Sequence, residues 1–294
     1  MVSGRMNIGE RTSEAARRAR FRALHVREQL FVMPNPWDVG SARLLASSGF
    51  EALATTSAGL AWSLGKLDHG VTRDELVDHV AILARATALP LNVDSEQCYP
   101  GDPGGVGETV ALLAGAGAAG FSIEDYDPGS DRIDDIALAT ERVAEAAEAL
   151  GRLSEPMLLT GRAENHLHGV DDLEDTIARL IAYRDAGADA VYAPGLSGLD
   201  QIVAVVEAVG VPVNVLARPD GPSIAELASV GVRRASTGGS LAAAAYGALA
   251  AASRELLTAG TSSYARGAVS RGELAAAFAP AEVGADPAGS TSNP

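Results

Sequence analysis

Two closely spaced carboxylates in the first half of the chain offer the clearest opportunity for chemistry. The run Leu89–Glu96, LPLNVDSE, has strand character, ends in Asp94 and Glu96, and precedes a Gly/Pro-rich loop. Residues two apart on a strand point the same way, so both acids would lie at the carboxyl end of a parallel strand, where α/β enzymes place their chemistry. Such carboxylates repel each other unless a cation or proton lies between them, and oxygen ligands suit Mg²⁺ or Mn²⁺. The alternative is that these acids only cap the following loop.

Further polar residues follow the other strand-like runs. They are Asn35, Trp37 and Asp38 after the first run, Thr56, Ser57 and Gly59 after the second, Glu124 and Asp125 after the fourth, Arg162, Glu164 and Asn165 after the fifth, and Asn214 within the seventh. Three acids beside one arginine indicate a metal next to an anion site, because a guanidinium binds a carboxylate or phosphate through two hydrogen bonds. Taken singly, each residue could instead satisfy a buried backbone group, and Glu164 could simply pair with Arg162.

Eight apolar runs of strand character alternate with amphipathic stretches of helical period. The runs are Leu30–Pro34, Ala52–Ser57, Leu89–Asp94, Gly120–Asp125, Met157–Arg162, Ala190–Pro194, Val211–Ala217 and Arg234–Gly238. Four junctions, GAGAAGFSIED, DAGADAVYAPG, EAVGVPVNVLA and SVGVRRASTGG, repeat one pattern of helix end, glycine turn and buried strand. This repetition predicts an α/β protein with a (β/α)₈ TIM barrel. The alternative, a doubly wound sheet, would more often carry a phosphate-binding fingerprint such as GxGxxG, which the sequence lacks.

The barrel is expected to have additional helices at both ends. The predicted organisation is an N-terminal helical extension over residues 1–28, the barrel over 29–260, a C-terminal helix over 261–279 and a disordered tail over 280–294. Within the extension, Arg11–Arg27 is rich in Ala and Arg and would pack on the outside of the barrel. The tail is expected to be disordered because it is rich in Gly, Pro, Ala and Ser.

The composition favours a cytoplasmic protein that handles small molecules. A formal net charge of −15 argues against nucleic acid or an anionic membrane as partner, because both favour basic patches. Cys98 is the only cysteine, which excludes a disulfide within the chain and fits a reducing compartment. The sequence has no run of about 18 apolar residues and no apolar signal core near its start. We therefore expect neither export nor membrane insertion.

Six segments together resemble the phosphoenolpyruvate mutase/isocitrate lyase superfamily. They read NPWDVGSARLLASSGFEALATTSAGLAWSLGKLD, NVDSEQCYPGD, AAGFSIEDYD, LLTGRAEN, YRDAGADAVYAPG and VPVNVLARPDGPS, and the likeness extends from about Phe31 to Leu257. The resemblance implies a barrel whose last helix is exchanged between subunits. It also implies Mg²⁺ at the carboxyl rim and 2-oxo acid or enolpyruvyl substrates.

The resemblance implies roles for individual residues. For the metal, Asp94 matches the direct ligand, and Glu96 and Glu124 match acids that hold the ion through water. For the substrate, Thr56, Ser57 and Ala58 match a loop whose backbone amides bind the carboxylate, Arg162 matches the substrate-binding arginine, and Asp68 matches the aspartate after an SLG turn. With the rim residues Trp37 and Asn214 as further substrate-binding candidates, the predicted catalytic set is Asp68, Arg162 and Glu124.

Two departures from the superfamily pattern bear on the reaction. Members usually carry Asp-x-Asp-x-Gly-Tyr-Gly, whereas this chain has DSEQCYP, with Glu96 for the second aspartate and Cys98 for a glycine. The lid after the fourth strand reads EDYDPGSDRIDD, without the Lys-Lys-Cys-Gly-His run of isocitrate and methylisocitrate lyases or the Lys and Asn of phosphonate enzymes. Its only basic residue is Arg132, and Cys98 lies on a different loop. Isocitrate cleavage is therefore disfavoured.

Three functions are compatible with these residues. The first is a Mg²⁺-dependent carbon–carbon lyase or decarboxylase that acts on a small 2-oxo acid or dicarboxylate through an enolate, which a metal and an arginine can stabilise. The second is phosphonopyruvate mutase or hydrolase chemistry at a C–P bond, which an acidic lid disfavours. The third is a barrel that binds a 2-oxo acid without turnover, because lost catalysis would leave a similar lid.

The proton donor to such an enolate is not identified by the sequence. His166 and His168, in RAENHLHG after the fifth strand, are candidates. Their HxH spacing also suits a metal, but two solvent-facing histidines on a flexible loop are the simpler interpretation. His69, Tyr99 and Tyr126 lie near the predicted rim without an assigned role.

The Ala-rich run after the eighth strand predicts a homodimer or homotetramer. SLAAAAYGALAAASRELLTAG has small residues on every face and no charge before Arg254, so it should be covered on both sides. The segment Ser262–Phe278 offers Leu274, Ala277 and Phe278 as a further apolar edge. We expect these helices to pack against or exchange with a partner. The alternative is a monomer in which Arg11–Arg27 covers the Ala-rich face.

Overall fold

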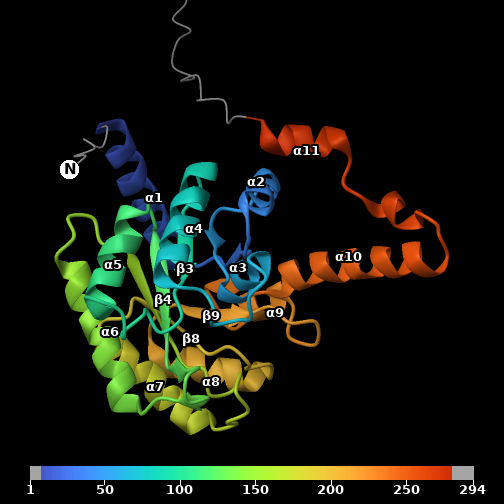
Figure 1. Ribbon diagram of the computed structural model, residues 1–294. Coiled ribbons are helices and arrows are strands. Elements are labelled where there is room, and N and C mark those ends of the chain that lie inside the picture. Colours follow the sequence, from blue (N-terminus) through green and yellow to red (C-terminus); the bar gives the residue numbers. More distant parts are fainter. Residues whose placement is uncertain (1–7, 280–294) are drawn as a thin grey trace, which may run out of the picture.

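The computed structural model describes residues 8–279, and eight parallel strands in that region form a nearly closed barrel surrounded by helices (Figure 1). The strands are β1 (Phe31–Met33), β2 (Leu53–Ala54), β3 (Leu91–Asp94), β4 (Gly120–Glu124), β7 (Leu158–Arg162), β8 (Ala190–Tyr192), β9 (Val213–Leu216) and β10 (Arg234–Ser236). They lie in the order β1-β10-β9-β8-β7-β4-β3-β2, and the Ala54 N–H donates to the Pro34 carbonyl (3.1 Å) where β1 and β2 meet. The predicted (β/α)₈ barrel and its eight strands are confirmed.

The helices follow the strands in the expected alternation. They are α2 (Val39–Ser47), α3 (Ser57–Ser63), α4 (Arg73–Ala86), α5 (Gly105–Gly115), α6 (Ile136–Gly151), α7 (Leu173–Asp185), α8 (Leu199–Val209), α9 (Ile224–Ser229) and α10 (Ser240–Thr258). Several begin at the side-chain caps that the sequence indicates; Thr72, for example, caps α4 in a reciprocal box with Glu75. The short helix α3 was not predicted, and it begins where Thr56 Oγ1 accepts from the Gly59 N–H (3.2 Å). Within residues 8–279 no helix is long and apolar enough to span a membrane.

A small antiparallel hairpin stands between β4 and α6, where the sequence predicted a lid. Its strands are β5 (Tyr126–Asp127) and β6 (Arg132–Ile133). Tyr126 Oη donates to Asp131 Oδ1 (2.6 Å), and Asp131 adopts the left-handed backbone region (φ 53°) in the turn. The lid is therefore an ordered ribbon whose turn is fixed by its own aromatic residue.

The N-terminal helix α1 (Ile8–Val26) closes the amino-terminal end of the barrel. The prediction that it packs along the outside of the barrel is therefore wrong. Phe21 is fully buried at the amino-terminal end, and it fits because Gly120 has no side chain: a Cβ would lie 2.6 Å from the Phe21 ring. Arg18 donates to three backbone carbonyls in the segments that lead into the strands: those of Ala114 (2.7 Å), Ala118 (3.0 Å) and Glu155 (2.7 Å). An apolar ring and a guanidinium together fasten this helix to the barrel floor.

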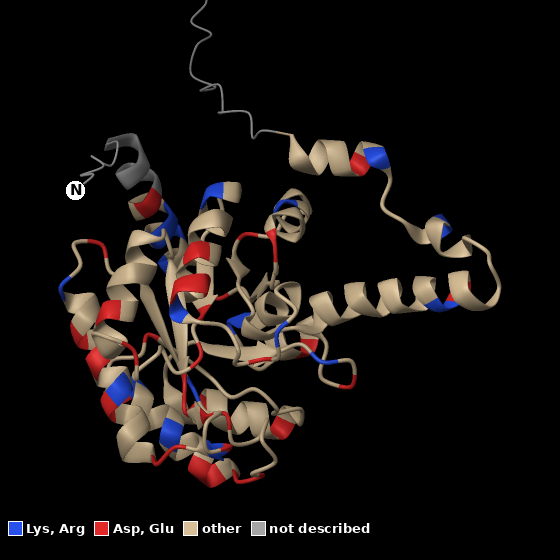
Figure 2. Cartoon of the chain, in the orientation of Figure 1, with Lys and Arg blue, Asp and Glu red and all other residues tan. Residues whose placement is uncertain are grey.

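The last barrel helix, α10, projects away from the barrel (Figure 1). Among its residues only Ala242 is buried, while Leu249 and Leu257 are 63% and 87% exposed. Figure 2 shows α10 without charged residues along most of its length, whereas both charge signs cover the helices around the barrel. This helix therefore presents small and apolar side chains to its surroundings.

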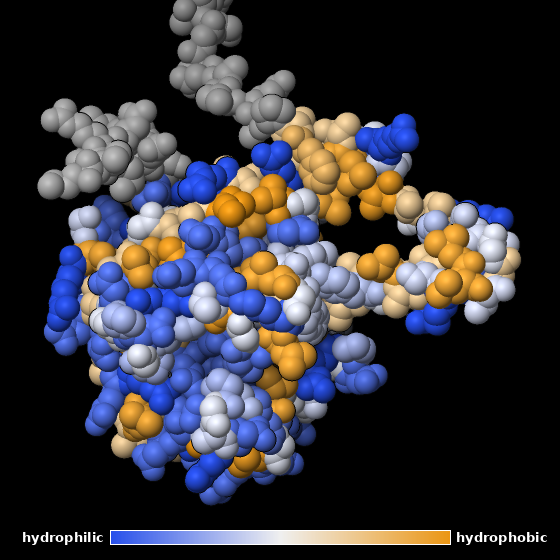
Figure 3. Space-filling model, viewed as in Figure 1, coloured by the Kyte–Doolittle hydropathy of each residue, from blue (hydrophilic) through white to orange (hydrophobic). Residues whose placement is uncertain are grey.

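Two short elements follow α10, where the sequence predicted a single helix over Ser262–Phe278. They are the 3₁₀ helix η1 (Ser263–Gly267) and α11 (Arg271–Phe278). The second returns to α2, where Arg43 Nη1 donates to the Phe278 carbonyl (3.3 Å). We call residues 240–278 the C-terminal arm; Figure 3 shows apolar residues along it. Exchange of the arm between subunits stays a prediction, and the predicted disordered tail (280–294) lies outside the described residues.

Phe21→Ala should lower the free energy of unfolding by about 3 to 5 kcal/mol, because it removes a fully buried ring and leaves a cavity at the barrel floor. Val26→Ala is a matched control on the same helix, because Val26 is 84% exposed and its loss should cost no more than about 0.5 kcal/mol. Urea unfolding followed by circular dichroism measures both. Equally small effects would show that α1 does not stabilise the barrel.

Candidate active site at the carboxyl rim

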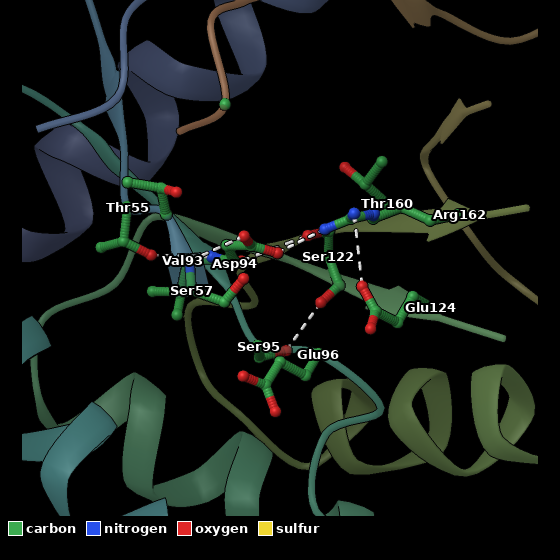
Figure 4. A network of polar contacts seen from close by, with 12 residues as sticks. Thr55, Ser57, Val93, Asp94, Ser95, Glu96, Ser122, Glu124, Thr160 and Arg162 are labelled. Atoms are coloured by element: carbon green, nitrogen blue, oxygen red, sulfur yellow. Dashed lines mark hydrogen bonds and ion pairs between the residues drawn. The ribbon is translucent and has the colours of Figure 1, made fainter. Parts of the chain in front are cut away.

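The carboxyl ends of β3, β4 and β7 bring carboxylates around one guanidinium (Figure 4). Arg162 at the end of β7 binds Asp94 Oδ1 through Nη1, and its Nη2 lies 3.3 Å from Glu124 Oε2. Its Nε donates to Glu164 Oε1 at 2.8 Å. Parallel register explains the grouping, because Glu124 lies directly opposite Arg162 on the neighbouring strand. The structure thus brings together the predicted acids Asp94 and Glu124 and the predicted arginine.

Burial and charge oppose each other in this cluster. Burial raises the pKa of Glu124 well above its ordinary value, and that of Glu164 as well, while Arg162 opposes both shifts. Burial alone would lower the pKa of Arg162, but the carboxylates of Glu164, Asp94 and Glu124 outweigh it, and the net shift is upward. One guanidinium therefore compensates only part of the buried negative charge, and the site is short of a cation.

Asp94 occupies the donors that the sequence assigned to a substrate carboxylate. Its Oδ2 accepts from the Ser57 N–H at 2.9 Å, and its Oδ1 accepts from Arg162. The Asp94 backbone N–H donates to Thr55 Oγ1 at 2.9 Å, which fixes the end of β3 against β2. The predicted amide and guanidinium donors thus converge on one point, and there they bind a carboxylate that the chain itself supplies.

Glu96 faces His69 across the rim. His69 Nδ1 lies 3.8 Å from Glu96 Oε2 and 3.8 Å from Glu124 Oε1. Burial raises the pKa of Glu96, although the nearby His69 imidazole opposes that shift. Oε1 of each glutamate is buried without a hydrogen-bond partner. Buried carboxylate oxygens without partners are rare, and a bound cation would satisfy them.

Within residues 8–279 no three His, Cys, Asp or Glu side chains are already arranged as metal ligands. Mg²⁺ does not require such an arrangement, because it usually keeps several waters and takes one or two carboxylates directly. Asp94, Glu96 and Glu124 fit that kind of site, because the unpaired oxygens and raised pKa values of the two glutamates mark uncompensated negative charge beside Asp94.

The other predicted substrate-binding residues, and the predicted catalytic residue Asp68, lie in three different settings. Thr56 and Ala58 stand at the start of α3, beside half-buried Trp37. Asn214 is buried inside the barrel, where it donates to Ser236 Oγ (2.9 Å) and accepts from Arg234. Asp68 is exposed and accepts from the His69 backbone N–H (3.1 Å), outside the Arg162 cluster. The roles assigned to these residues stay predictions.

A cavity of about 60 Å³ leads from Asp94 and Arg162 into the barrel, and sequence reasoning missed several of its residues, among them Tyr192 and Arg234. The Tyr192 ring lies 5.2 Å from the guanidinium carbon of Arg162. Arg234 is fully buried, and burial lowers its pKa to about 10; it donates to Asn214 Oδ1 (2.9 Å) and Thr160 Oγ1 (3.1 Å). Strand alternation could have found Arg234, because it shares its strand face with Ser236, which also borders the cavity.

Asp125 fixes the backbone next to the site through three hydrogen bonds. Its Oδ1 accepts from the Glu164 backbone N–H (2.8 Å), and its Oδ2 accepts from Tyr183 Oη (2.5 Å) and from Arg179 Nη1 (3.1 Å). Tyr183 reaches this position because Gly161 lets α7 approach β7 closely: a Cβ there would lie 2.7 Å from Tyr183 Cβ. The backbone around Glu164 is thereby tied to the neighbouring strand and helix.

Cys98 is unsuited to acid–base chemistry. It is fully buried, and burial raises the pKa of its thiol to about 12. It adopts a left-handed backbone (φ 63°) at the position where the superfamily pattern has glycine, so the loop keeps its conformation without that residue. The expectation that Cys98 does not replace the lid thiol agrees with this environment.

The two histidines of the HxH segment face different neighbours. His166 Nδ1 lies 3.2 Å from Asp171 Oδ1, and the His168 ring stacks on Tyr126 with 3.6 Å between centroids. Their side chains therefore do not form the metal pair that the spacing allowed.

A (β/α)₈ barrel with carboxylates, one arginine and a backbone amide gathered at its carboxyl rim is typical of enzymes that act on small anionic substrates. The chain belongs to the phosphoenolpyruvate phosphomutase family, which it matches over residues 21–257. It is 34% identical over 212 residues to oxaloacetate decarboxylase of Paraburkholderia xenovorans, covering 69% of each chain. Among solved structures it is similar to a candidate lyase/mutase of Burkholderia cenocepacia J2315 (48% identity, 92% and 98% coverage, TM-score 0.87). It is also similar to oxaloacetate acetylhydrolase bound to its product oxalate (26% identity, 90% and 94% coverage, TM-score 0.80). The resemblance drawn from the six segments is confirmed.

In the absence of metal, the free energy of unfolding should fall as pH rises above about 4.5, the ordinary Glu value. The folded protein holds a proton on Glu124 that the unfolded chain releases, so rising pH favours unfolding until the raised folded pKa is passed. Glu124→Gln should reduce this slope, because an amide does not ionise. Glu148→Gln is the control, since the Glu148 side chain is 70% exposed on α6. Urea titrations with EDTA from about pH 5 to 8 measure how the free energy of unfolding of each protein depends on pH. Identical pH dependences for all three proteins would contradict the shortage of positive charge at Glu124.

Proposed function

We propose that the protein is a Mg²⁺-dependent carbon–carbon lyase for a small 2-oxo dicarboxylate, with decarboxylation of oxaloacetate as its preferred reaction. The observation that carries the proposal is the joint binding of one carboxylate, that of Asp94, by the Ser57 N–H and Arg162. A substrate carboxylate on the same donors would lie beside the buried acids that lack a cation. The similarity to an oxaloacetate decarboxylase and to oxaloacetate acetylhydrolase supports this class of substrate.

Decarboxylation of such a substrate needs an electron sink but no base to start it. The bond between C3 and the distal carboxylate breaks, carbon dioxide leaves, and the electron pair forms the C2–C3 double bond of an enolate. A bound Mg²⁺, held by Asp94 and through water by Glu96 and Glu124, would supply positive charge for that enolate oxygen. Arg162 would orient a substrate carboxylate through its planar fork, and a proton from solvent at C3 completes the product.

The chemistry of the lid agrees with this choice. Cleavage of a hydroxy acid such as isocitrate begins with removal of a hydroxyl proton, so it requires a base near the reacting carbon. The lid residues 124–135 contain no Cys, Lys or His, and Cys98 is buried with its pKa raised to about 12. A decarboxylase of a 2-oxo acid does without that base.

Chemistry at a C–P bond is the second candidate, because the family takes its description from phosphoenolpyruvate phosphomutase. A phosphonate carries more negative charge than a carboxylate. The hairpin presents Asp127 and Asp131 with Arg132 as its single cation, and Arg132 is exposed. This charge disfavours the reaction. Binding without turnover, the third possibility, has no support from the enzymes that the chain resembles.

We also propose that the C-terminal arm packs against a second copy of the chain, in a homodimer or homotetramer. Apolar side chains are exposed along α10: Tyr246 at 38%, Leu249 at 63%, Leu256 at 48% and Leu257 at 87%. A helix with so little buried surface gains little from its own barrel, and exposed apolar surface of this kind is typical of protein interfaces. Its many alanines would allow a partner helix to approach closely.

The reaction is tested by assaying oxaloacetate, phosphonopyruvate and methylisocitrate with and without Mg²⁺. We expect turnover of oxaloacetate only, and its loss with EDTA. Asp94→Ala should abolish Mg²⁺ binding in calorimetry and lower turnover at least about 100-fold, as loss of an oxyanion stabiliser does. Asp185→Ala, at a side chain 62% exposed, is the control. Unchanged Mg²⁺ affinity in Asp94→Ala would refute the metal assignment, and turnover of phosphonopyruvate alone would favour the second candidate.

Assembly is tested by light scattering at micromolar concentration. We expect a multiple of the monomer mass for the full chain and a shift toward the monomer in Leu249→Asp, because a charge on α10 would be buried in the interface. Leu138→Asp, at a residue 45% exposed on α6, should leave the mass unchanged. A monomeric mass for the unaltered chain would disprove the proposal.

A further inference from the structure

Three buried polar atoms without hydrogen-bond partners meet at the rim: His69 Nδ1, Glu96 Oε1 and Glu124 Oε1. The nitrogen lies 3.8 Å from Glu124 Oε1 and 3.8 Å from Glu96 Oε2, the other oxygen of the Glu96 carboxylate. Glu124 is 5% exposed and Glu96 is 8% exposed, so water offers these groups little compensation. Leaving several buried polar atoms unpaired in one place is costly, and a common ligand would satisfy all three.

Two of these residues, His69 and Glu96, face each other from strained backbone conformations. His69 (φ 59°) and Glu96 (φ 51°) both adopt the left-handed region, which residues other than glycine rarely occupy. They come from separate loops, His69 from the connection between α3 and α4 and Glu96 from the connection after β3. Strain of this kind persists where the surroundings fix it and is typical of functional sites.

Aromatic rings hold the imidazole of His69 in place. Its ring centroid lies 5.3 Å from that of Tyr126, and Tyr126 in turn stacks on His168 at 3.6 Å and 16°. Tyr126 is also tied to the hairpin turn through Asp131. These rings form a wall on one side of His69, while Nδ1 faces the glutamates on the other.

We propose that His69 supplies a nitrogen ligand to the cation at this rim, so that the site favours metals that accept imidazole, such as Co²⁺, beyond what its carboxylates alone would give. The inference rests on the cation site of the proposed function. Imidazole suits the later transition metals, whereas Mg²⁺ takes oxygen ligands. Ligands of one such ion lie about 3 Å apart, so the ring needs to move by roughly 1 Å to bind.

His69 could instead act only as a positive charge opposite the two glutamates. The two roles differ in what removal of the side chain does. A competing positive charge weakens every divalent metal alike, so its removal would strengthen Mg²⁺ and Co²⁺ equally. A nitrogen ligand discriminates, so its removal weakens Co²⁺ and leaves Mg²⁺ nearly unchanged.

Calorimetric titration of the full chain with Mg²⁺ and with Co²⁺ separates these roles. His69→Ala should weaken Co²⁺ binding about tenfold or more and change Mg²⁺ binding by no more than about twofold. His168→Ala, which removes the outer ring of the wall, should leave the ratio of the two affinities unchanged. In the Co²⁺ protein, proton NMR should show a paramagnetically shifted imidazole N–H signal that His69→Ala lacks.

Several results would overturn the inference: an equal gain for both metals in His69→Ala, an unchanged Co²⁺ affinity, no shifted N–H signal, or an equal loss of Co²⁺ affinity in His168→Ala. Failure of the proposed function would look different. If the unaltered chain binds neither metal, the cation site itself is wrong. If both metals bind through Asp94 and His69→Ala changes neither, only the nitrogen ligand is wrong.

Discussion

The rim of this barrel is organised by an excess of buried negative charge over a single guanidinium. Arg162 binds Asp94 and Glu164 and approaches Glu124, yet burial still raises the pKa of both glutamates. Buried charges of one sign are tolerated only when something compensates them, and in this cluster the compensation within the chain is incomplete. In the proposed function a cation and an anionic substrate would bind to such a site together, because each would compensate a charge that the other leaves uncompensated.

The scaffold fixes these charges through groups that never touch the substrate site. Asp125 binds the Glu164 backbone, Tyr183 and Arg179, and Gly161 permits the close approach that this requires. At the opposite end of the barrel, α1 closes the floor with Phe21. Charges held in this way on strand ends cannot move apart to relieve their repulsion, and in the proposed function a bound cation would relieve it instead.

The barrel and much of the rim could be predicted because they follow from short-range patterns. Strand runs ending in Asp94, Glu124 and Arg162 place those side chains at one end of parallel strands whatever the loops do. The position of His69 could not be predicted in the same way, because it depends on how one loop folds over another. The floor helix was misplaced for a similar reason: Arg11–Arg27 has the pattern of any surface helix, and its position depends on the space that Gly120 leaves for Phe21.

The two departures from the superfamily pattern have different physical consequences. At Cys98 the residue changes but the left-handed backbone is kept, so Glu96 is still presented to the rim. At the lid the acid–base group is absent, and the hairpin is held instead by Tyr126 and Asp131. Compared with the superfamily pattern, this chain therefore keeps the residues that compensate charge and lacks the lid residues that transfer protons. A reaction whose difficult step is the development of negative charge on oxygen, with no prior deprotonation, is the kind that the remaining features can accelerate.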